Sequence, residues 1–359
     1  LNFWYIILME SRDFVTTREE LESVLVLSEH ESRWFSVHQG ALPLRISRYY
    51  LDLIDPEDPD DPLRRQVVPS WYETVHDGQG NLDPLAEVFH SPLSRLIHRY
   101  ENRVALLLTD RCATYCRHCF RRRFTASGEQ GISDDELHKV LSYLAEHTEI
   151  REILLTGGDP LTLSDSRLAS ILDALRAVRS TLVLRLCSRM PVTYPFRVTD
   201  RLIDLLSRHT KPALYLMLQF NHHREITPQS VEAVARFVDS GIPVMNQTVL
   251  LRGVNDDVET LEQLMNDLVS IRVKPYYLFQ GDLVDGTGHL RVPLEHGLAL
   301  ERELRGRLSG LAMPTYALDL PEGGGKVPLG TSYLRNSDGN GSWEFSTVHG
   351  ELRRYPDPK

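Results

Sequence analysis

Three of the four cysteines in the chain lie within eight residues, in the segment Cys112-Ala-Thr-Tyr-Cys116-Arg-His-Cys119. Three thiolates can ligate an iron–sulfur cube and leave its fourth iron open to another ligand. A structural zinc site takes four protein ligands, so a zinc-binding module would need His118 as the fourth. Buried structural cysteines are a further alternative. So few cysteines at ligand spacing are typical of a reducing compartment and not of a disulfide framework.

A glycine-rich turn, Gly157-Gly-Asp-Pro160, follows the second predicted strand, and Ser188-Arg189 follows the third. Glycines let backbone amides approach a ligand closely, although a plain strand-to-helix turn has the same composition. Together with the Cys-x3-Cys-x2-Cys spacing, this turn resembles the radical S-adenosylmethionine (SAM) superfamily. The resemblance implies a [4Fe-4S] cluster on Cys112, Cys116 and Cys119, and SAM contacts from Gly157, Gly158, Asp159, Ser188 and Arg189.

A lysine follows three consecutive glycines, at Gly323-Gly-Gly-Lys326. The stretch has the composition of a flexible loop, but it is not a phosphate loop, because Val327 stands where that motif needs Ser or Thr. A Schiff-base lysine that carries pyridoxal 5′-phosphate (PLP) fits better. The glycines would let the backbone pass close to the cofactor, and burial would lower the pKa of the amine.

From about Tyr49 to Gly330 the sequence is similar to the lysine 2,3-aminomutase family, with matching blocks at 98–103, 246–256 and 275–283. The resemblance implies an isomerase that moves the 2-amino group of L-lysine to C3, giving β-lysine. A 5′-deoxyadenosyl radical made from SAM would act on the PLP-bound amino acid. The resemblance also implies an external electron donor of the flavodoxin or ferredoxin type and a homo-oligomer.

The resemblance assigns roles to single residues of this chain. Lys326 would be the catalytic residue and would bind PLP, whose phosphate and ring would be held by Arg99, Tyr100, Arg103 and Gln247. Arg121 would bind the substrate α-carboxylate through the planar fork of its guanidinium. Arg122 and Arg123 are expected in a solvated basic loop. The ε-ammonium of the substrate would be held by two acidic residues, Asp282 and Asp319.

The two aspartates favour a cationic substrate. A glutamate side chain about 4 Å from one of them would lose on the order of 4 kcal/mol at an effective dielectric near 20, and the glutamate 2,3-aminomutases replace this acidic pair. Arginine also carries a cation, so an arginine 2,3-aminomutase or another amino-acid 2,3-aminomutase stays an alternative. A lysine isomerase that feeds the modification of a translation factor is another.

Three positions depart from the family pattern. Gln219 stands where a histidine is usual, at a SAM or substrate contact, and Phe279 stands where a tyrosine is usual, which removes a hydroxyl near the site. No cysteine follows Cys187. The ligands of the C-terminal zinc element of the clostridial enzyme are therefore missing, and that element cannot be inferred here.

The elements that position these residues alternate between strand and helix from Arg103 onward. Apolar runs predict six strands: Val104–Leu108, Glu152–Leu155, Leu182–Leu186, Ala213–Leu218, Val244–Leu250 and Pro275–Phe279. Helical spacing and capping signals lie between them, at Ser133–Glu146, Leu168–Leu175, Thr227–Gly241 and Leu261–Leu268. This alternation predicts an α/β fold with a parallel sheet. Six units are too few for a standard eight-fold barrel, and the resemblance implies an open partial (β/α)6 barrel of the radical SAM type.

The chain divides into a helical N-terminal region (1–91), the partial barrel (92–290) and a short C-terminal segment with the PLP lysine (291–359). Thr16–Leu27 and Ile46–Ile54 have helical apolar spacing, Asp55–Pro62 is a loop by composition, and Trp343–Val348 is strand-like. In such folds ligands gather at the carboxyl ends of the strands. The cysteine segment lies there, directly after the first predicted strand.

A formal charge of −10 argues against a nucleic-acid partner and agrees with a small-molecule amino-acid substrate. Leu1–Leu8 is apolar, but a bilayer span takes roughly 20 residues, and the segment lacks the features of a signal peptide. We therefore expect a cytoplasmic protein without a membrane partner. Met9 could be the true start of the chain.

Overall fold

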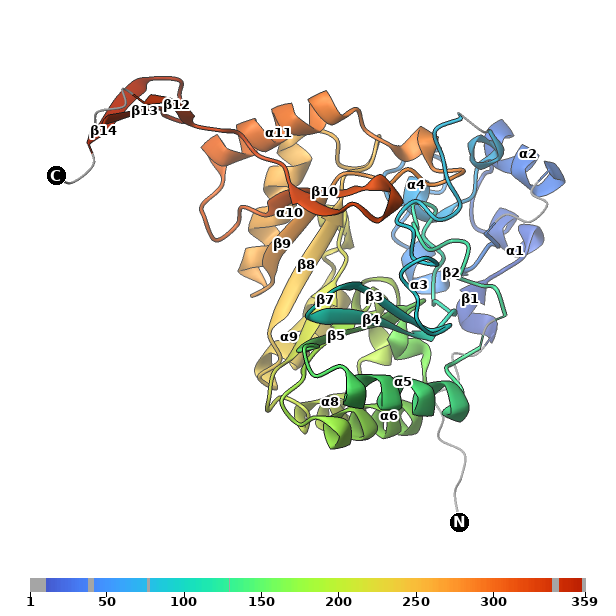
Figure 1. Ribbon diagram of the computed structural model, residues 1–359. Coiled ribbons are helices and arrows are strands. Elements are labelled where there is room, and N and C mark those ends of the chain that lie inside the picture. The colour runs from blue at the N-terminus through green and yellow to red at the C-terminus, as the bar shows by residue number, and fades with distance from the viewer. Residues whose placement is uncertain (1–10, 38–41, 76–77, 129, 338–341, 357–359) are drawn as a thin grey trace, which may run out of the picture.

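The computed structural model describes residues 11–37, 42–75, 78–128, 130–337 and 342–356, and one curved sheet is its central element (Figure 1). Its strands are β3 (Leu96–Tyr100), β4 (Arg103–Thr109), β5 (Glu152–Gly157), β6 (Val183–Cys187), β7 (Leu214–Leu218), β8 (Val244–Val249), β9 (Lys274–Phe279), β10 (Thr315–Leu320) and β11 (Gly325–Pro328). They lie in the order β11-β10-β9-β8-β7-β6-β5-β4-β3. From β4 to β10 neighbours pair in parallel, and β3 and β11 pair antiparallel at the two edges.

Helices connect the parallel strands and cover the outside of the sheet (Figure 1). The capping residues that predicted the starts of two of these helices cap them in the structure. Ser133 and Glu136 form a capping box at the start of the first of these helices, and Thr227 caps a helix that has Pro228 at its first position. The helices are α5 (Asp134–Glu146), α6 (Asp165–Val178), α7 (Met190–Thr193), α8 (Asp200–Ser207), α9 (Pro228–Asp239), α10 (Val258–Ser270) and α11 (Leu294–Arg307).

All six predicted strands are confirmed, as β4 to β9. The seventh parallel strand, β10, was not predicted, and neither were the edge strands β3 and β11. The apolar run in β10 is short, because Asp319 interrupts it, and it does not predict a strand. Ala317 is buried and the residues from Leu318 to Leu320 are half-buried. Because β10 and β11 continue the sheet, the segment that carries Lys326 is joined to the barrel by backbone hydrogen bonds.

The N-terminal region contains short helices, but also a two-stranded sheet that was not expected. The helix predicted over Thr16–Leu27 ends after Glu22, because the hydroxyl of Ser23 donates to the Glu20 carbonyl and competes with helical bonding. The Asp55–Pro62 segment is a loop, as predicted. The elements are β1 (Phe14–Val15), α1 (Arg18–Glu22), α2 (Glu29–Val37), β2 (Ile46–Ser47), α3 (Arg48–Leu51) and α4 (Arg64–Val67).

Short 3-10 helices occupy many of the loops: η1 (Ser11–Asp13), η2 (Trp71–Thr74), η3 (Pro160–Thr162), η4 (Pro195–Arg197), η5 (His223–Glu225), η6 (Gly288–Leu290) and η7 (Pro321–Gly323). The predicted strand near Trp343 is found as β13 (Ser342–Ser346), which pairs with β12 (Leu334–Ser337) and β14 (Leu352–Pro356) in a small sheet that projects from the barrel (Figure 1). The expectations for Leu1–Leu8 and Met9 lie outside the described residues. No helix in the described part of the chain has the length and apolar content to cross a membrane.

The two faces of the sheet differ in burial. On the outer face, Leu184 and Leu186 of β6 are fully buried against helices, whereas Arg185 and Cys187 on the inner face are only half-buried. The same alternation recurs in β8. Parallel sheets are usually covered on both faces. A half-exposed inner face with polar residues therefore indicates a chamber that ligands enter, and not a closed core.

Side chains join the two edges of the sheet. Arg99 of β3 donates from Nη2 to Oδ1 of Asp319 on β10, at 2.9 Å. The hydroxyl of Tyr100 accepts a hydrogen bond from the backbone amide of Lys326 on β11, also at 2.9 Å. Strands β3 and β11 are the first and last of the sheet, so these contacts close a partial barrel across its open seam.

A buried charge cluster fixes the N-terminal region to the cysteine segment. Glu73 of η2 accepts hydrogen bonds from Arg117, at 2.5 and 2.8 Å, and from Arg122, at 2.6 Å. The Glu73 side chain has no exposed surface and that of Arg122 is 10% exposed. The expectation that Arg122 lies in a solvated loop is therefore wrong. Arg123, 28% exposed, is paired with Asp83 at 3.1 Å and is not a free surface cation either.

We expect Glu73→Gln to destabilise the fold by about 3–5 kcal/mol, because it leaves two arginines without a buried counter-charge. Burial alone would raise the pKa of Glu73, but the charges and hydrogen bonds of Arg117 and Arg122 outweigh it and lower that pKa. The contribution of the carboxylate is thus present above its unfolded pKa and is lost as the pH falls through the lowered folded value. Urea unfolding at neutral pH measures the loss.

Glu232→Gln is the matched control, because Glu232 pairs with Arg236 on the surface and is 68% exposed. It should change the unfolding free energy by less than about 0.5 kcal/mol. Equal effects of the two variants would show that the buried cluster does not stabilise the fold.

Candidate active site

The cysteine segment lies at the carboxyl end of β4 and is tied to the Gly-Gly-Asp-Pro turn after β5. The amide of Gly158 donates to the Thr109 carbonyl at 2.6 Å, and that of Asp159 donates to the Arg111 carbonyl at 2.8 Å. A Cβ atom on Gly158 would lie 2.3 Å from the Arg111 oxygen, and Gly157 has a φ of +112°. The glycines therefore let two loops of the protein approach each other, and these two amides are not left free for a ligand.

The predicted SAM residues form one buried group. Asp159 accepts hydrogen bonds from the Ser188 hydroxyl and from the Arg189 amide, both at 2.8 Å. Burial raises the pKa of Asp159, although these bonds oppose the shift. The structure thus brings the second and third predicted loops together beside the cysteines. Whether these residues contact SAM stays a prediction.

The cysteine segment suits a cationic cluster. All three cysteines are half-buried, and none of them is in a disulfide. Burial raises the pKa of Cys112 and Cys119, and in each case a neighbouring thiolate raises it further. Three thiolates in one place require positive charge, and a bound cluster provides it while displacing the protons. One compensating cation is present already, because Arg189 Nη1 lies 2.7 Å from Cys116 Sγ.

The side chain of His118 contacts a protein group through one of its ring nitrogens. Its Nε2 atom is 3.1 Å from the side-chain amide of Gln219, and burial, followed by the charge of Arg189, lowers its pKa to about 3. Within the described residues no three His, Cys, Asp or Glu side chains surround one ion position. In a [4Fe-4S] cluster each cysteine ligates a different iron atom, so the three thiolates do not have to surround a single ion position. Gln219, which replaces the usual histidine, therefore contacts the cysteine segment itself.

Four of the five predicted PLP residues lie in one contact group. Asp319 and Lys326 are opposite each other in the β10–β11 pair, and the Lys326 amine is ion-paired with Asp319. Asp319 also binds Arg99, and the Arg103 guanidinium lies 3.7 Å from the centre of the Tyr100 ring. The fifth residue, Gln247, is half-buried on the inner face of β8. It is paired in register with Tyr277, whose ring centre is 5.3 Å from the Lys326 amine.

This group fits the parts of PLP. Arg103 forms no ion pair with any described residue, so its charge is available to a phosphate. The aromatic ring of Phe279 lies 3.9 Å below the Lys326 amine and provides an apolar surface there. The departure from tyrosine at Phe279 therefore occurs in direct contact with the predicted catalytic lysine.

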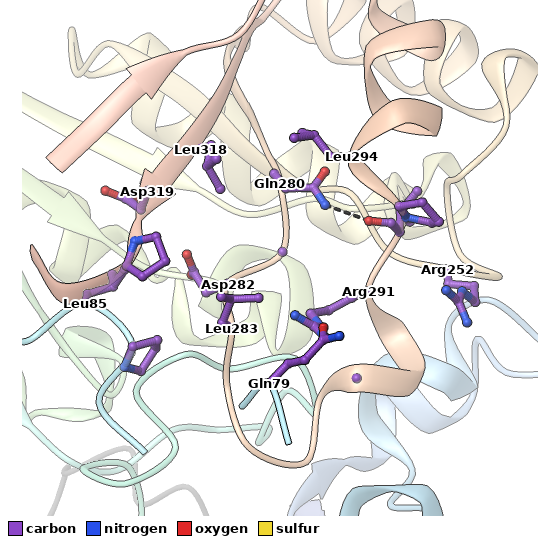
Figure 2. Close-up of a pocket in the computed structure, with 16 residues that line it drawn as sticks. Gln79, Leu85, Arg252, Gln280, Asp282, Leu283, Arg291, Leu294, Leu318 and Asp319 are labelled. Carbon is purple, nitrogen blue, oxygen red and sulfur yellow. Dashed lines mark hydrogen bonds between the residues drawn. The ribbon is translucent and has the colours of Figure 1, made fainter. Parts of the chain in front are cut away.

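Two of the three predicted substrate residues, Asp282 and Asp319, line one cavity, and the third, Arg121, is not among the residues that line it. Asp282 and Asp319 are on one side of a cavity of about 420 Å³, with Arg252 and Arg291 on the other (Figure 2). Burial, and next the charge of Asp319, raises the pKa of Asp282 to about 7. The charges of Lys326 and Arg121 lower it, which places both cations within electrostatic reach of this carboxyl group.

Two acidic residues at the site, Glu87 and Glu225, were not predicted from the sequence. Glu87 pairs with Arg121 at 2.8 Å, and Glu225, fully buried, pairs with Arg189 at 2.6 Å. Glu87 lies in a segment without helical or strand periodicity, so no pattern marked it. The sequence offered one indirect signal for Glu87. The three arginines at 121–123 carry a dense positive charge, and an acidic chain can supply carboxylates to pair with it.

Comparison with known proteins identifies the family. Two family models match, the Radical SAM superfamily over residues 106–267 and Lysine-2,3-aminomutase over residues 301–359. The L-lysine 2,3-aminomutase of Clostridium subterminale is 41% identical over 323 residues, which are 90% of this chain and 77% of that protein. The chain belongs to the lysine 2,3-aminomutase family. A putative L-lysine 2,3-aminomutase of Aquifex aeolicus is 41% identical over 99% of the chain and 95% of its own length.

Membership in this family makes the protein a radical SAM isomerase, for which a [4Fe-4S] cluster and SAM are implied. The zinc-module alternative is therefore wrong, since the chain is an enzyme of this family. Membership does not fix the substrate. A glutamate 2,3-aminomutase of Clostridioides difficile is 39% identical over 89% of the chain and 75% of its own length.

We expect Gly158→Ala to lower iron incorporation several-fold, because the added Cβ would displace Arg111, which directly precedes Cys112. Iron and sulfide content and the cluster absorbance after anaerobic reconstitution measure the effect. Gly306→Ala on α11 is the control, since nothing lies within 4 Å of the added atom and alanine favours a helix. Normal iron content in Gly158→Ala would contradict the role given to this close approach.

Proposed function

We propose that the protein is an L-lysine 2,3-aminomutase that converts L-lysine to β-lysine, with PLP carried by Lys326 as a third cofactor. The observation that carries the proposal is the pair of carboxyl groups, Asp282 and Asp319, on one side of the chamber beside the Lys326 amine. Such a pair attracts an ammonium group. It would repel a glutamate side chain at about 4 Å by on the order of 4 kcal/mol.

The residues of the barrel seam are suited to hold PLP. Arg99 and Arg103 supply cations for the phosphate, Tyr100 supplies an aromatic face, and Gln247 supplies hydrogen-bonding groups on the neighbouring wall. When bound, PLP supplies a conjugated ring that stabilises the reacting amino acid, while SAM and the cluster supply the radical. The protein contributes position and charge.

The substrate would be held at both ends. Arg121 is suited to bind the α-carboxylate and the two aspartates to bind the ε-ammonium, which fixes the carbons between them. Asp319 already holds the ammonium of a lysine, namely that of Lys326. Once Lys326 is engaged with the cofactor, the carboxylate of Asp319 is available to the ammonium of the substrate.

Apolar side chains are suited to keep water from the reacting carbons. Pro84, Leu85, Leu283, Leu318 and Pro321 line the cavity beside the two aspartates. Less water around the charged ends of the substrate strengthens both ionic contacts, and it leaves fewer groups that can quench a radical.

The decisive experiment offers lysine, arginine and glutamate separately to enzyme reconstituted with iron, sulfide, SAM, PLP and a reductant. We expect β-lysine from lysine, identified by mass spectrometry. Lys326→Ala should form no product and lose the visible absorbance of protein-bound PLP. Product from arginine alone would assign the arginine alternative, and product from glutamate alone would refute a cationic substrate.

We expect the KM for lysine to rise about tenfold from pH 8 to pH 6, because only ionised Asp282 attracts the ammonium and its pKa is about 7. Asp282→Asn should raise KM at pH 8 and remove most of this pH dependence. KM values across this range in wild type and variant measure both effects. An unchanged pH profile in Asp282→Asn would show that another group titrates.

A further inference from the structure

The guanidinium of Arg121 is already paired with a carboxylate of the protein itself, that of Glu87. Glu87 accepts from Arg121 Nε, at 2.9 and 3.2 Å, and Nη2 lies 2.8 Å from the same carboxylate. Thr156 at the end of β5 accepts from Nη1 at 3.1 Å. Both members of the ion pair are largely buried, with 14% of the Arg121 side chain and 10% of the Glu87 side chain exposed. The contact is thus largely shielded from solvent.

The hydrogen bonds of Arg121 leave one edge of its guanidinium open. A guanidinium has five N–H donors. Glu87 engages the edge formed by Nε and Nη2, and Thr156 takes one N–H of Nη1. One N–H on each of Nη1 and Nη2 remains, and these two nitrogens form the outer edge that binds carboxylates through two parallel hydrogen bonds.

The segment that carries Glu87 is itself held in place from both sides. The Asp83 carboxylate accepts from the amides of Glu87 and Val88, at 3.0 and 2.9 Å, and is paired with Arg123. The Pro84 carbonyl accepts from the Glu322 amide at 3.1 Å. The segment from Asp83 to Val88 therefore connects the arginine run after the cysteines to the loop before Lys326.

We propose that Glu87 is a positioning residue that orients Arg121 so that its outer edge receives the α-carboxylate of the amino-acid substrate. The inference rests on the lysine 2,3-aminomutase function proposed above. Arginine has a long side chain with many rotamers, and an ion pair along one edge removes most of them before the substrate arrives. Glu87 then acts through Arg121 without touching the substrate.

The test is Glu87→Gln, which keeps the size of the side chain but removes the negative charge that pairs with Arg121. We expect the KM for lysine to rise about tenfold, as for loss of a hydrogen bond to a charged group, with kcat nearly unchanged. Titration of the PLP absorbance with lysine, without reductant, should show the same loss of affinity. Affinity for lysinamide, which lacks the carboxylate, should not change.

Further variants complete the test. Glu322→Gln removes an exposed acidic charge from the neighbouring loop and keeps the backbone contact to Pro84, so it should bind lysine like wild type. Thr156→Val removes the other partner of Arg121 and should weaken lysine binding about threefold without affecting lysinamide. If Glu87→Gln does not fold, Glu87→Asp, which keeps the charge but shortens the side chain, tests the same contact and should also weaken the binding of lysine and not that of lysinamide.

Each other result overturns the inference. Tighter lysine binding by Glu87→Gln would mean that Glu87 competes with the substrate for Arg121. Equal losses for lysine and lysinamide would mean a purely structural role, and unchanged lysine binding would mean no role at all. Wild-type protein that neither binds lysine nor forms β-lysine would instead refute the proposed function.

Discussion

The structure depends on one carboxylate, that of Asp319, at the seam of the partial barrel. It binds Arg99 from the first strand of the sheet and the Lys326 amine from the last. These two strands share no backbone hydrogen bonds, so the contacts of Asp319 and the Tyr100–Lys326 hydrogen bond bring the edges together. The position of the lysine that is proposed to carry PLP, and the closure of the chamber, are therefore set by the same few atoms.

The site is built from compensated charges. Each arginine of the run 121–123 is paired with an acidic residue from the N-terminal region, namely Glu87, Glu73 and Asp83 respectively. Glu225 likewise compensates Arg189 beside Cys116. An acidic chain can thus hold a dense group of guanidinium ions, because each of them is neutralised by a carboxylate of the same chain.

Sequence patterns predicted the parts of the fold that have a period or a cap. The six strands and the capping box at Ser133 follow from local spacing, and the cysteine motif led to the correct family. The patterns did not predict β10, β11 and Glu87, whose roles come from contacts between residues far apart in the chain. The glycines at 157 and 158 show the same limit, since their sequence indicates close approach but not that the approaching group is the backbone of Thr109 and Arg111.

The distribution of charge explains why an amino acid with two charged ends suits the chamber. Burial, and next the charge of Asp319, raises the pKa of Asp282 to about 7, so protonation of Asp282 relieves the repulsion between the two carboxyl groups. A nearby cation lowers that pKa, as the charges of Lys326 and Arg121 do, and so favours the ionised form of Asp282. Arg121, which is proposed to bind the α-carboxylate, keeps one edge free of hydrogen bonds while Glu87 neutralises its charge. Under the proposed function, a ligand with only one charged group would satisfy only one of these ends, whereas lysine would satisfy both and span the reacting carbons between them.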